Sequence, residues 1–266
     1  MVDFKEKERY GFDDLLEIMD ILRGDGGCPW DREQTHRSIR RNFIEEVYEA
    51  CEAIDNDDSA LLCEELGDVL MQVVFHADMA EEEGAFSIDD VCDGVCKKLV
   101  SRHPHVFGQA QLDDSAQVLD AWEEIKKKEK GQKSHAQEMD RVAKSLPALI
   151  YAEKIQKKAR KAGFDWPDVS GALDKVREET AELSEALASG KGVEEEVGDL
   201  LFAAVNAARL SNVDPEEALV RAVRKFASRF ARVERMAGDK MAQMSLEQLD
   251  KLWDEAKREE KETPIH

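Results

Sequence analysis

Apolar residues recur at three- and four-residue spacing along most of this chain, which is the pattern of amphipathic helices. A first group of helices is predicted at residues 12–23, 43–54, 60–82, 87–102 and 115–130. A second group is predicted at residues 145–163, 170–188, 193–210, 214–236 and 245–260. The helix at 214–236 opens with Asp214 and Pro215, a capping acceptor followed by proline at the first helical position.

The composition and the spacing of the helices indicate two all-α domains. Only 6 prolines and 15 glycines occur in 266 residues. The abundant Ala, Leu, Glu and Lys lose little side-chain freedom in a helix. Residues 131–140 have the polar composition of a linker. We therefore predict a first domain at 1–130, a linker at 131–140 and a second domain at 141–266.

The second half of the chain repeats the first in order as well as in kind, which indicates a tandem duplication. The acidic pair of Glu46 and Glu49 matches Glu179 and Glu182 at an offset of 133 residues. The later matches are Glu65 and Asp68 with Glu196 and Asp199, Lys98 and Arg102 with Lys225 and Arg229, Trp122 and Lys126 with Trp253 and Lys257, and Trp30 with Trp166. Two acidic helices that were alike by chance would not reproduce this order.

The matched acidic residues lie three residues apart, so each pair shares one face of a helix. Two neighbouring helices then bring four carboxylates together in each half. Like charges at this spacing destabilise a helix by a few tenths of a kcal/mol per pair, and by more when they lose solvent. Apolar runs flank Asp68 and Asp199, as in "LGDVL" and "VGDLL", which is unlike a solvated face. A cation is therefore expected between the carboxylates.

Every matched candidate ligand is an oxygen donor, which favours Mg2+, with Mn2+ as the alternative, over zinc or copper. A di-iron bundle would need a Glu-x-x-His motif on two helices. The chain has that motif only at Glu33 and His36, outside the matched set. Mg2+ usually completes its shell with water and substrate phosphates. The matched lysine and arginine pairs suit phosphate oxygens, and an indole suits a nucleobase, so the set describes a nucleotide polyphosphate site.

Charge and composition exclude other classes of protein. The chain carries 38 basic and 59 acidic residues, a formal net charge of −21, which opposes binding to nucleic acid. No apolar run is long enough for a membrane span, and the start lacks the apolar core of a signal peptide. The five cysteines form no Cys-x-x-Cys pair, which is typical of free thiols. We predict a cytoplasmic protein without a membrane or nucleic-acid partner.

At these motifs the sequence resembles the MazG family of nucleoside triphosphate pyrophosphohydrolases, in which an EExxE helix precedes an ExxD helix. The resemblance runs from "CPWD" through "RHPHVF", "SLPAL" and "GFDW" to "LWDEAK", essentially the whole chain. It implies an all-α bundle, usually dimeric, that hydrolyses nucleoside triphosphates to monophosphate and pyrophosphate with Mg2+. The expected partners are nucleoside triphosphates and a second copy of the chain.

The resemblance also implies roles for the matched residues. Metal ligands would be Glu179, Glu182, Glu196 and Asp199, and in the first half Glu46, Glu49, Glu65 and Asp68. Glu178 or Glu195 would orient water or accept its proton. Substrate contacts would come from Lys225, Arg229, Trp253 and Lys257, and in the first half from Lys98, Arg102, Trp122 and Lys126. Neither half lacks a metal position, and we favour the second as catalytic.

Two other functions stay open at this stage. One is a pyrophosphatase restricted to dUTP or dCTP, and the other is a helical scaffold without turnover. The residues do not distinguish the clearing of damaged nucleotides from the control of nucleotide pools.

Overall fold

The computed structural model describes residues 4–110, 114, 117–118, 121–122, 125 and 134–262. The described chain is helical and contains no strand, so the prediction of an all-α fold is confirmed. It divides into two compact units, Met1–Lys130 and Gly131–His266. No helix within the described ranges is both long and apolar enough to cross a membrane.

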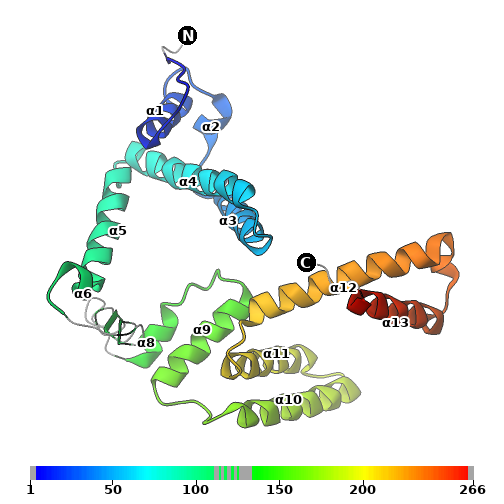
Figure 1. Ribbon diagram of the computed structural model, residues 1–266. Helices are drawn as coiled ribbons and strands as arrows, with labels where there is room; N and C mark the ends of the chain where they lie inside the picture. Colours follow the sequence, from blue (N-terminus) through cyan, green and yellow to red (C-terminus); the bar gives the residue numbers. More distant parts are fainter. Residues whose placement is uncertain are drawn as a thin grey trace. The chain divides into compact units, whose positions relative to one another are not determined.

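The first unit is centred on a pair of long antiparallel helices, α3 and α4 (Figure 1). Its helices are α1 (Phe12–Arg23), α2 (Pro29–Glu33), α3 (Arg40–Asp55), α4 (Ser59–Glu82), α5 (Ile88–Arg102) and α6 (Pro104–Phe107). Helix α1 packs on α4, and its Met19 joins Val74, Phe75 and Met79 in a buried cluster. The helix expected at 115–130 lies for the most part outside the described residues.

The second unit repeats the long pair with α10 and α11, which also run antiparallel (Figure 1). Its helices are α8 (His135–Asp140), α9 (Ala148–Lys161), α10 (Val169–Ser189), α11 (Val193–Leu210), α12 (Pro215–Ala237), the short 3-10 helix η1 (Gly238–Gln243) and α13 (Leu246–Glu262). Helix α9 packs on α11, and α12 packs on α13. The predicted start of α12 is confirmed, because the Asp214 side chain accepts a hydrogen bond from the Glu217 amide at 3.0 Å.

The stretch predicted as a linker, residues 131–140, is not a linker throughout, because His135–Asp140 form helix α8. The Ser134 side chain accepts a hydrogen bond from the Gln137 amide and caps this helix. The carboxylate of Glu138 is buried and pairs with Lys158 of α9 at 3.3 Å. Most of its described polar residues are exposed, and the buried Glu138 is the one that joins the segment to α9.

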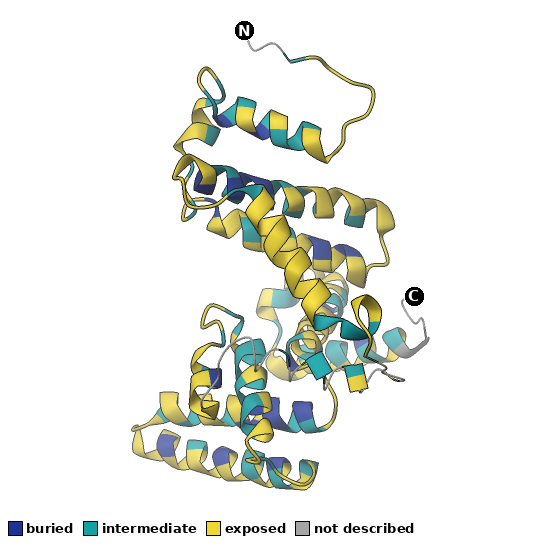
Figure 2. Cartoon of the chain, turned by 90° about the vertical axis from the view of Figure 1, so that its left-hand side faces the viewer, coloured by how far each residue is buried: buried dark blue, intermediate teal, exposed yellow. Residues whose placement is uncertain are grey.

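Tight loops join the two long helices of each unit and fix their register. In the second unit the loop includes Gly190 and Gly192, whose φ angles of +69° and +75° lie in the left-handed region that glycine adopts readily. Asp57 occupies the matching place in the first unit with φ +53°. Small buried residues, among them Ala172, Ala186 and Ala203, then allow close approach of α10 and α11. Figure 2 shows buried positions recurring between exposed ones along the helices.

One buried group of charges anchors α1 to α4. Arg23 is 7% exposed, and its guanidinium lies 2.7 Å from Asp78 and 2.5 Å from Glu82. Its Cζ atom also lies 5.1 Å from the centre of the Phe75 ring. Burial raises the pKa of Asp78 to about 6, with a further contribution from its hydrogen bond to Asp20, and Arg23 opposes the rise. Arg23 therefore only partly balances the negative charge of ionised Asp78.

This arrangement predicts a pH dependence of stability. The folded pKa of Asp78 is raised. The stability that protonated Asp78 contributes to the folded unit is therefore fully present below about pH 4 and is lost as the pH rises through about 6. Asp20→Asn removes a like charge, so we expect the free energy of unfolding of the first unit to rise by roughly 1 kcal/mol at pH 7.5 and little at pH 4. Hydrogen exchange of α4 measures this change. Glu17→Gln on α1 is the control, and an equal effect of Asp20→Asn at both pH values contradicts the assignment.

Candidate metal and nucleotide site

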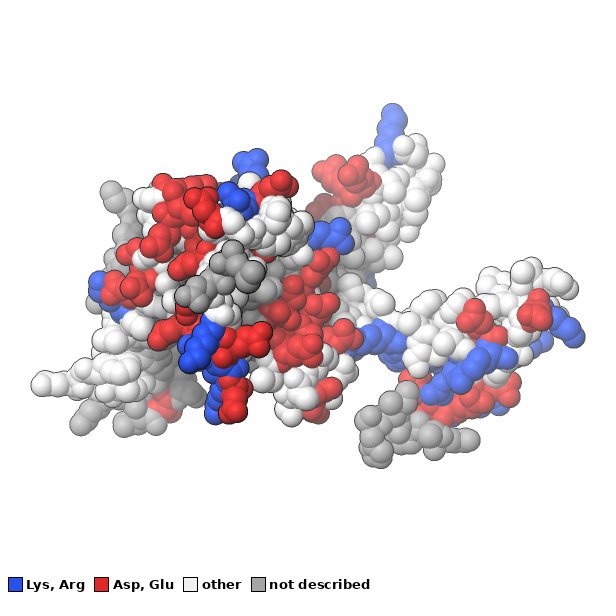
Figure 3. Space-filling model, turned by 90° about the horizontal axis from the view of Figure 1, so that it is seen from above, with Lys and Arg blue, Asp and Glu red and all other residues white. Residues whose placement is uncertain are grey.

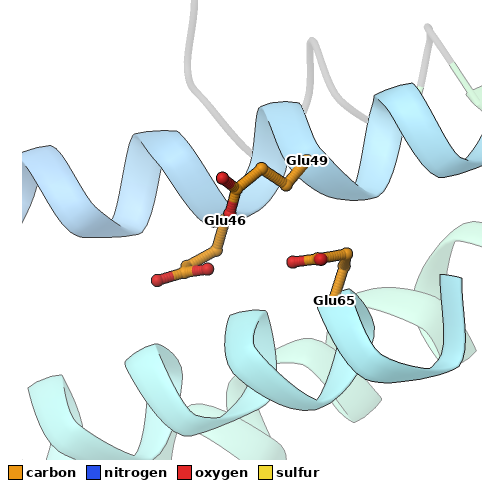
Figure 4. Close-up of side chains that lie close together, drawn as sticks. All are labelled: Glu46, Glu49 and Glu65. Carbon is orange, nitrogen blue, oxygen red and sulfur yellow. The ribbon is translucent and has the colours of Figure 1, made fainter. Parts of the chain in front are cut away.

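The first unit brings three of its four predicted metal ligands into one group. Glu46 and Glu49 come from α3 and Glu65 comes from α4, and each offers a carboxylate oxygen within 4.8 Å of the others. Their side chains point into the space between the two helices (Figure 4). Asp68 lies one turn beyond Glu65 on α4, outside this group of three, but close enough to act on Glu46.

The carboxylates of the first unit repel one another. Burial, followed by the charges of Asp68 and Glu49, raises the pKa of Glu46. Burial and the charge of Glu49 raise the pKa of Glu65. Among the described residues, no ion pair joins a lysine or arginine to Glu46, Glu49 or Glu65. The group has the donors and the uncompensated negative charge that suit a divalent cation.

The second unit holds two overlapping groups of carboxylates, and Glu179 belongs to both. One group consists of Glu178, Glu179 and Glu182 on α10. The other joins Glu179 to Glu196 and Asp199 on α11, again with ligand oxygens within 4.8 Å of one another. Glu179 is 3% exposed, and its Oε2 atom is buried without a hydrogen-bond partner in the part of the chain that the structure describes. An unpartnered buried carboxylate oxygen is costly, and a metal ion would satisfy it.

Electrostatics also point to a cation in the second unit. Burial and then the charge of Glu179 raise the pKa of both Glu182 and Glu196. Asp199 and Glu195 add to the rise at Glu196, so Glu195 lies near the group although it is not one of its members. Figure 3 shows more acidic than basic side chains on the surface that it draws, in keeping with the formal net charge of −21 of the whole chain. The residues present therefore fit a hard divalent cation.

A lysine that the sequence reasoning missed neutralises part of this charge. Lys175 of α10 lies 2.8 Å from Glu178 and 2.5 Å from Glu179, and these two carboxylates raise its pKa well above the ordinary value. The helical spacing offered a signal, because Lys175 is one turn before Glu179 on the same face. The residue at the matching place in the first half, at the offset of 133, is Asn42.

The predicted substrate residues of the second unit lie on a different pair of helices, α12 and α13. Arg229 pairs with Glu260 at 2.6 Å, and its Cζ atom lies 5.9 Å from the Trp253 ring. Lys257 pairs with Asp254 at 2.6 Å. In the described part of the unit, no hydrogen bond or ion pair joins Lys225, Arg229 or Lys257 to the carboxylates of α10 and α11.

The matching residues of the first unit are only partly described. Lys98 is exposed on α5, and Arg102 ends that helix. The Trp122 ring lies 6.2 Å from the ring of His103, between ring centres. Lys126 lies outside the described residues. The roles of these residues stay predictions.

A cavity of about 590 Å3 adjoins the second carboxylate group, and we call it the α9–α11 cavity. Its lining includes the metal-ligand candidates Glu179 and Asp199 together with Lys175. The rest of the lining comes from α9, α11 and the loop before α10, chiefly Ile155, Gln156, Phe164, Trp166, Phe202 and Asn206. Sequence reasoning did not find this cavity, because its lining comes from three separate segments, 155–166, 175–179 and 199–209, whose packing leaves no pattern in the sequence.

One buried arginine fixes the wall of the cavity. Arg209 of α11 is 7% exposed and donates hydrogen bonds to both carboxylate oxygens of Asp165, at 3.0 and 2.5 Å. Its Nε atom donates to Asn206 Oδ1 at 2.9 Å. These bonds hold the loop that carries Phe164 and Trp166 against α11. The Arg209 side chain lowers the pKa of Asp165.

Comparison with known proteins places the chain in a family. The model of the MazG nucleotide pyrophosphohydrolase domain matches residues 34–107 and again 169–233. Each match contains one of the two sets of metal-ligand candidates.

Two curated proteins are similar over nearly the whole chain. The "Nucleoside triphosphate pyrophosphohydrolase/pyrophosphatase MazG" of Thermotoga maritima is 46% identical, with 92% of this chain and 95% of that protein covered. The "Nucleoside triphosphate pyrophosphohydrolase" of Escherichia coli K12 is 44% identical, with 93% and 97% covered. A solved mazG-related protein from Thermotoga maritima is 27% identical and covers 43% of this chain and 98% of its own, with a TM-score of 0.38.

The chain belongs to the MazG nucleotide pyrophosphohydrolase family. The predicted family and the predicted tandem duplication are thereby confirmed, since the domain occurs twice.

The Arg209 network predicts a large effect of substitution. Arg209→Met leaves the largely buried Asp165 with only the more distant guanidinium of Arg160, 3.8 Å away, so we expect the free energy of unfolding of the second unit to fall by roughly 3 kcal/mol at pH 7. Because the folded pKa of Asp165 is lowered, the contribution is present above about pH 4 and is lost below it. Urea unfolding followed by hydrogen exchange of α11 measures the loss.

The control for Arg209→Met is Arg177→Met, which breaks an exposed pair with Asp174 on α10. An exposed pair contributes under about 1 kcal/mol, so this variant should remain close to wild type. Equal losses in the two variants contradict the special role of Arg209.

Proposed function

We propose that this protein hydrolyses nucleoside triphosphates between the α and β phosphates, with Mg2+ held by the carboxylates of the second unit. The observation that carries the proposal is the position of Glu179. Its buried, unpartnered oxygen lies in two carboxylate groups and at the edge of a cavity of ligand size.

The reaction class rests on the family. The prediction of a nucleoside triphosphate pyrophosphohydrolase is confirmed by the two matches to the domain model and by the names of relatives that are 44–46% identical over most of the chain. The identity of the metal belongs to the proposal, and it is supported by donor sets composed only of carboxylates.

Glu179, Glu182, Glu196 and Asp199 would hold the metal. When bound, Mg2+ supplies positive charge to the phosphate oxygens and makes water a stronger acid. A water oxygen would form a bond to the α-phosphorus, and the bond between the α-phosphorus and the oxygen that bridges to the β-phosphorus would break. Monophosphate and pyrophosphate are the products.

A carboxylate outside the main ligand set would take the proton from water. Glu178 is the stronger candidate, since its carboxylate lies in the α10 group and also contacts Lys175 at 2.8 Å. Glu195, which acts on Glu196 through its charge, is the second candidate. Lys175 would hold the carboxylate of Glu178 in place and offer a positive charge to the triphosphate.

The substrate roles of α12 and α13 remain part of the proposal. Lys225 and Arg229 would neutralise the charge of the departing pyrophosphate, with Trp253 and Lys257 beside them. Arg229 would exchange its partner Glu260 for a phosphate oxygen, which suits a guanidinium equally well. The first unit, with Glu46, Glu49, Glu65 and Asp68, would bind metal in the same way.

The first experiment is to incubate the protein with each common ribo- and deoxyribonucleoside triphosphate and to identify the products by chromatography. We expect monophosphate and pyrophosphate with Mg2+ and no products with EDTA. Glu179→Gln combined with Glu49→Gln should lower kcat by at least about 100-fold, because charge stabilisation is lost in both units.

Glu185→Gln, on α10 but outside both carboxylate groups, is the matched control and should keep wild-type turnover. Diphosphate and phosphate as products would show that the wrong bond has been assigned. Turnover of dUTP or dCTP alone would identify the narrow pyrophosphatase.

We infer that a second copy of the chain covers α12. Leu219, Val223, Phe226 and Phe230 form one apolar stripe at three- and four-residue spacing, and all four are exposed. Val223, for example, is 58% exposed. A stripe of this kind favours a protein partner over solvent.

Light scattering after gel filtration tests the dimer. We expect the mass of a dimer for the wild type and a shift toward monomer for Val223→Glu, because a charge in the stripe would lose its solvent. Arg221→Gln makes the same one-unit change in charge on the opposite face of α12 and should remain dimeric. A monomeric wild type would refute the inference.

A further inference from the structure

The α9–α11 cavity contains a polar group that the proposed chemistry does not use. Gln156 of α9 is 5% exposed and lines the cavity. Its Nε2 atom donates a hydrogen bond of 2.8 Å to the backbone carbonyl of Phe202. Because a carbonyl only accepts, this bond fixes the orientation of the amide. The Oε1 atom is then an acceptor, and it is buried without a partner in the described part of the second unit.

We propose that this cavity binds the nucleobase of the substrate, and that Gln156 Oε1 accepts a hydrogen bond from an N–H group of the base. The inference rests on the proposed function, since it takes the triphosphate to lie at the carboxylates. Glu179 and Asp199 line both the metal site and the cavity, so a nucleotide held by its phosphates would have its base directed there.

The walls of the cavity suit a flat aromatic ring. Phe164 and Trp166 provide aromatic faces on the loop that Arg209 holds, and Phe202 adds a third. Aromatic stacking accepts any base, because every base has a π face. A Cβ atom at Gly171 would collide with Cδ1 of the Trp166 ring, so glycine is required there for the indole to lie against α10.

A single hydrogen-bond acceptor admits every common base but discriminates against a base that has no N–H group to donate. Adenine, cytosine and guanine each carry an exocyclic amino group, and uracil and thymine carry a ring N–H. All can satisfy Gln156, whereas unsubstituted purine, which has neither an exocyclic amino group nor a free ring N–H in its riboside, cannot. A buried acceptor left unpaired disfavours binding, so the site should discriminate against such a base.

In the first unit, large side chains stand at the positions that match the lining of the α9–α11 cavity. Asp199 matches Asp68 at an offset of 131 residues, and at the same offset Asn206 matches Phe75. Phe75 is 4% exposed. Trp166 matches Trp30 at an offset of 136 residues, and at the same offset Ala159 matches Arg23. The Arg23 guanidinium lies over the Phe75 ring. Gln156 corresponds to Asp20. The base-binding features therefore belong to the second unit alone among the described parts of the duplication.

The test compares ATP with purine riboside 5′-triphosphate, which lacks the amino group. Both are assayed on a Glu49→Gln background so that turnover reports the second unit. We expect kcat/KM to be about threefold to tenfold higher for ATP. In Gln156→Leu the value for ATP should fall to that for the analogue, which itself should change little. Gln243→Leu, the same change at an exposed position of η1, should keep the full preference for ATP.

A binding measurement without turnover separates the two proposals. In EDTA, saturation-transfer NMR with AMP should show contacts to the base protons H2 and H8, and Asn206→Phe should remove them by filling the cavity. Base contacts without hydrolysis of any triphosphate would support the base site and overturn the proposed function. Hydrolysis without base contacts, or equal use of ATP and the analogue by the wild type, would overturn the base site and leave the proposed function standing.

Discussion

Repulsion between carboxylates is the constraint around which both units are built. Each unit holds acidic side chains from two helices with oxygens within 4.8 Å of one another, and burial raises the pKa of several of them. Such a group persists only if the helices are held together by other means. Tight loops with left-handed residues, closely packed alanines and the Arg209 network of the second unit supply them. Folding energy from elsewhere thus maintains a site that is ready for a cation.

The features that could be predicted from sequence are those with a local pattern. Helical spacing located the long helices, and the ordered recurrence of acidic pairs located both carboxylate groups. The pair of Arg209 and Asp165, 44 residues apart in the chain, leaves no periodic trace. The α9–α11 cavity escaped for the same reason, because it is formed by three separate segments. Residues 135–140 looked like a linker because their composition is polar and does not show the one contact that anchors them, the ion pair between Glu138 and Lys158 of α9.

The two halves keep the same acidic residues but differ beside them. Close to the carboxylates of the second unit lie a glutamine and an asparagine, and the first unit places an aspartate and a phenylalanine at those positions. The acidic residues are therefore the same in the two halves. The residues beside them, which shape the adjoining space, have diverged. A metal-binding framework of paired helices can evolve in this way without a change of fold.

Lys175 gives the second unit a tethered counterion. Its ammonium group lies against Glu178 and Glu179, whereas the matched position in the first unit is the uncharged Asn42. A divalent ion bound by the free Oε2 atom of Glu179 would lie beside this internal cation, whereas the first unit has no lysine at the matched position. A fixed positive charge beside a cation site opposes a second cation, so the two halves of the chain would differ in their affinity for a divalent ion. The charge balance of the second carboxylate group is thus set in part by a side chain that is not one of the proposed metal ligands.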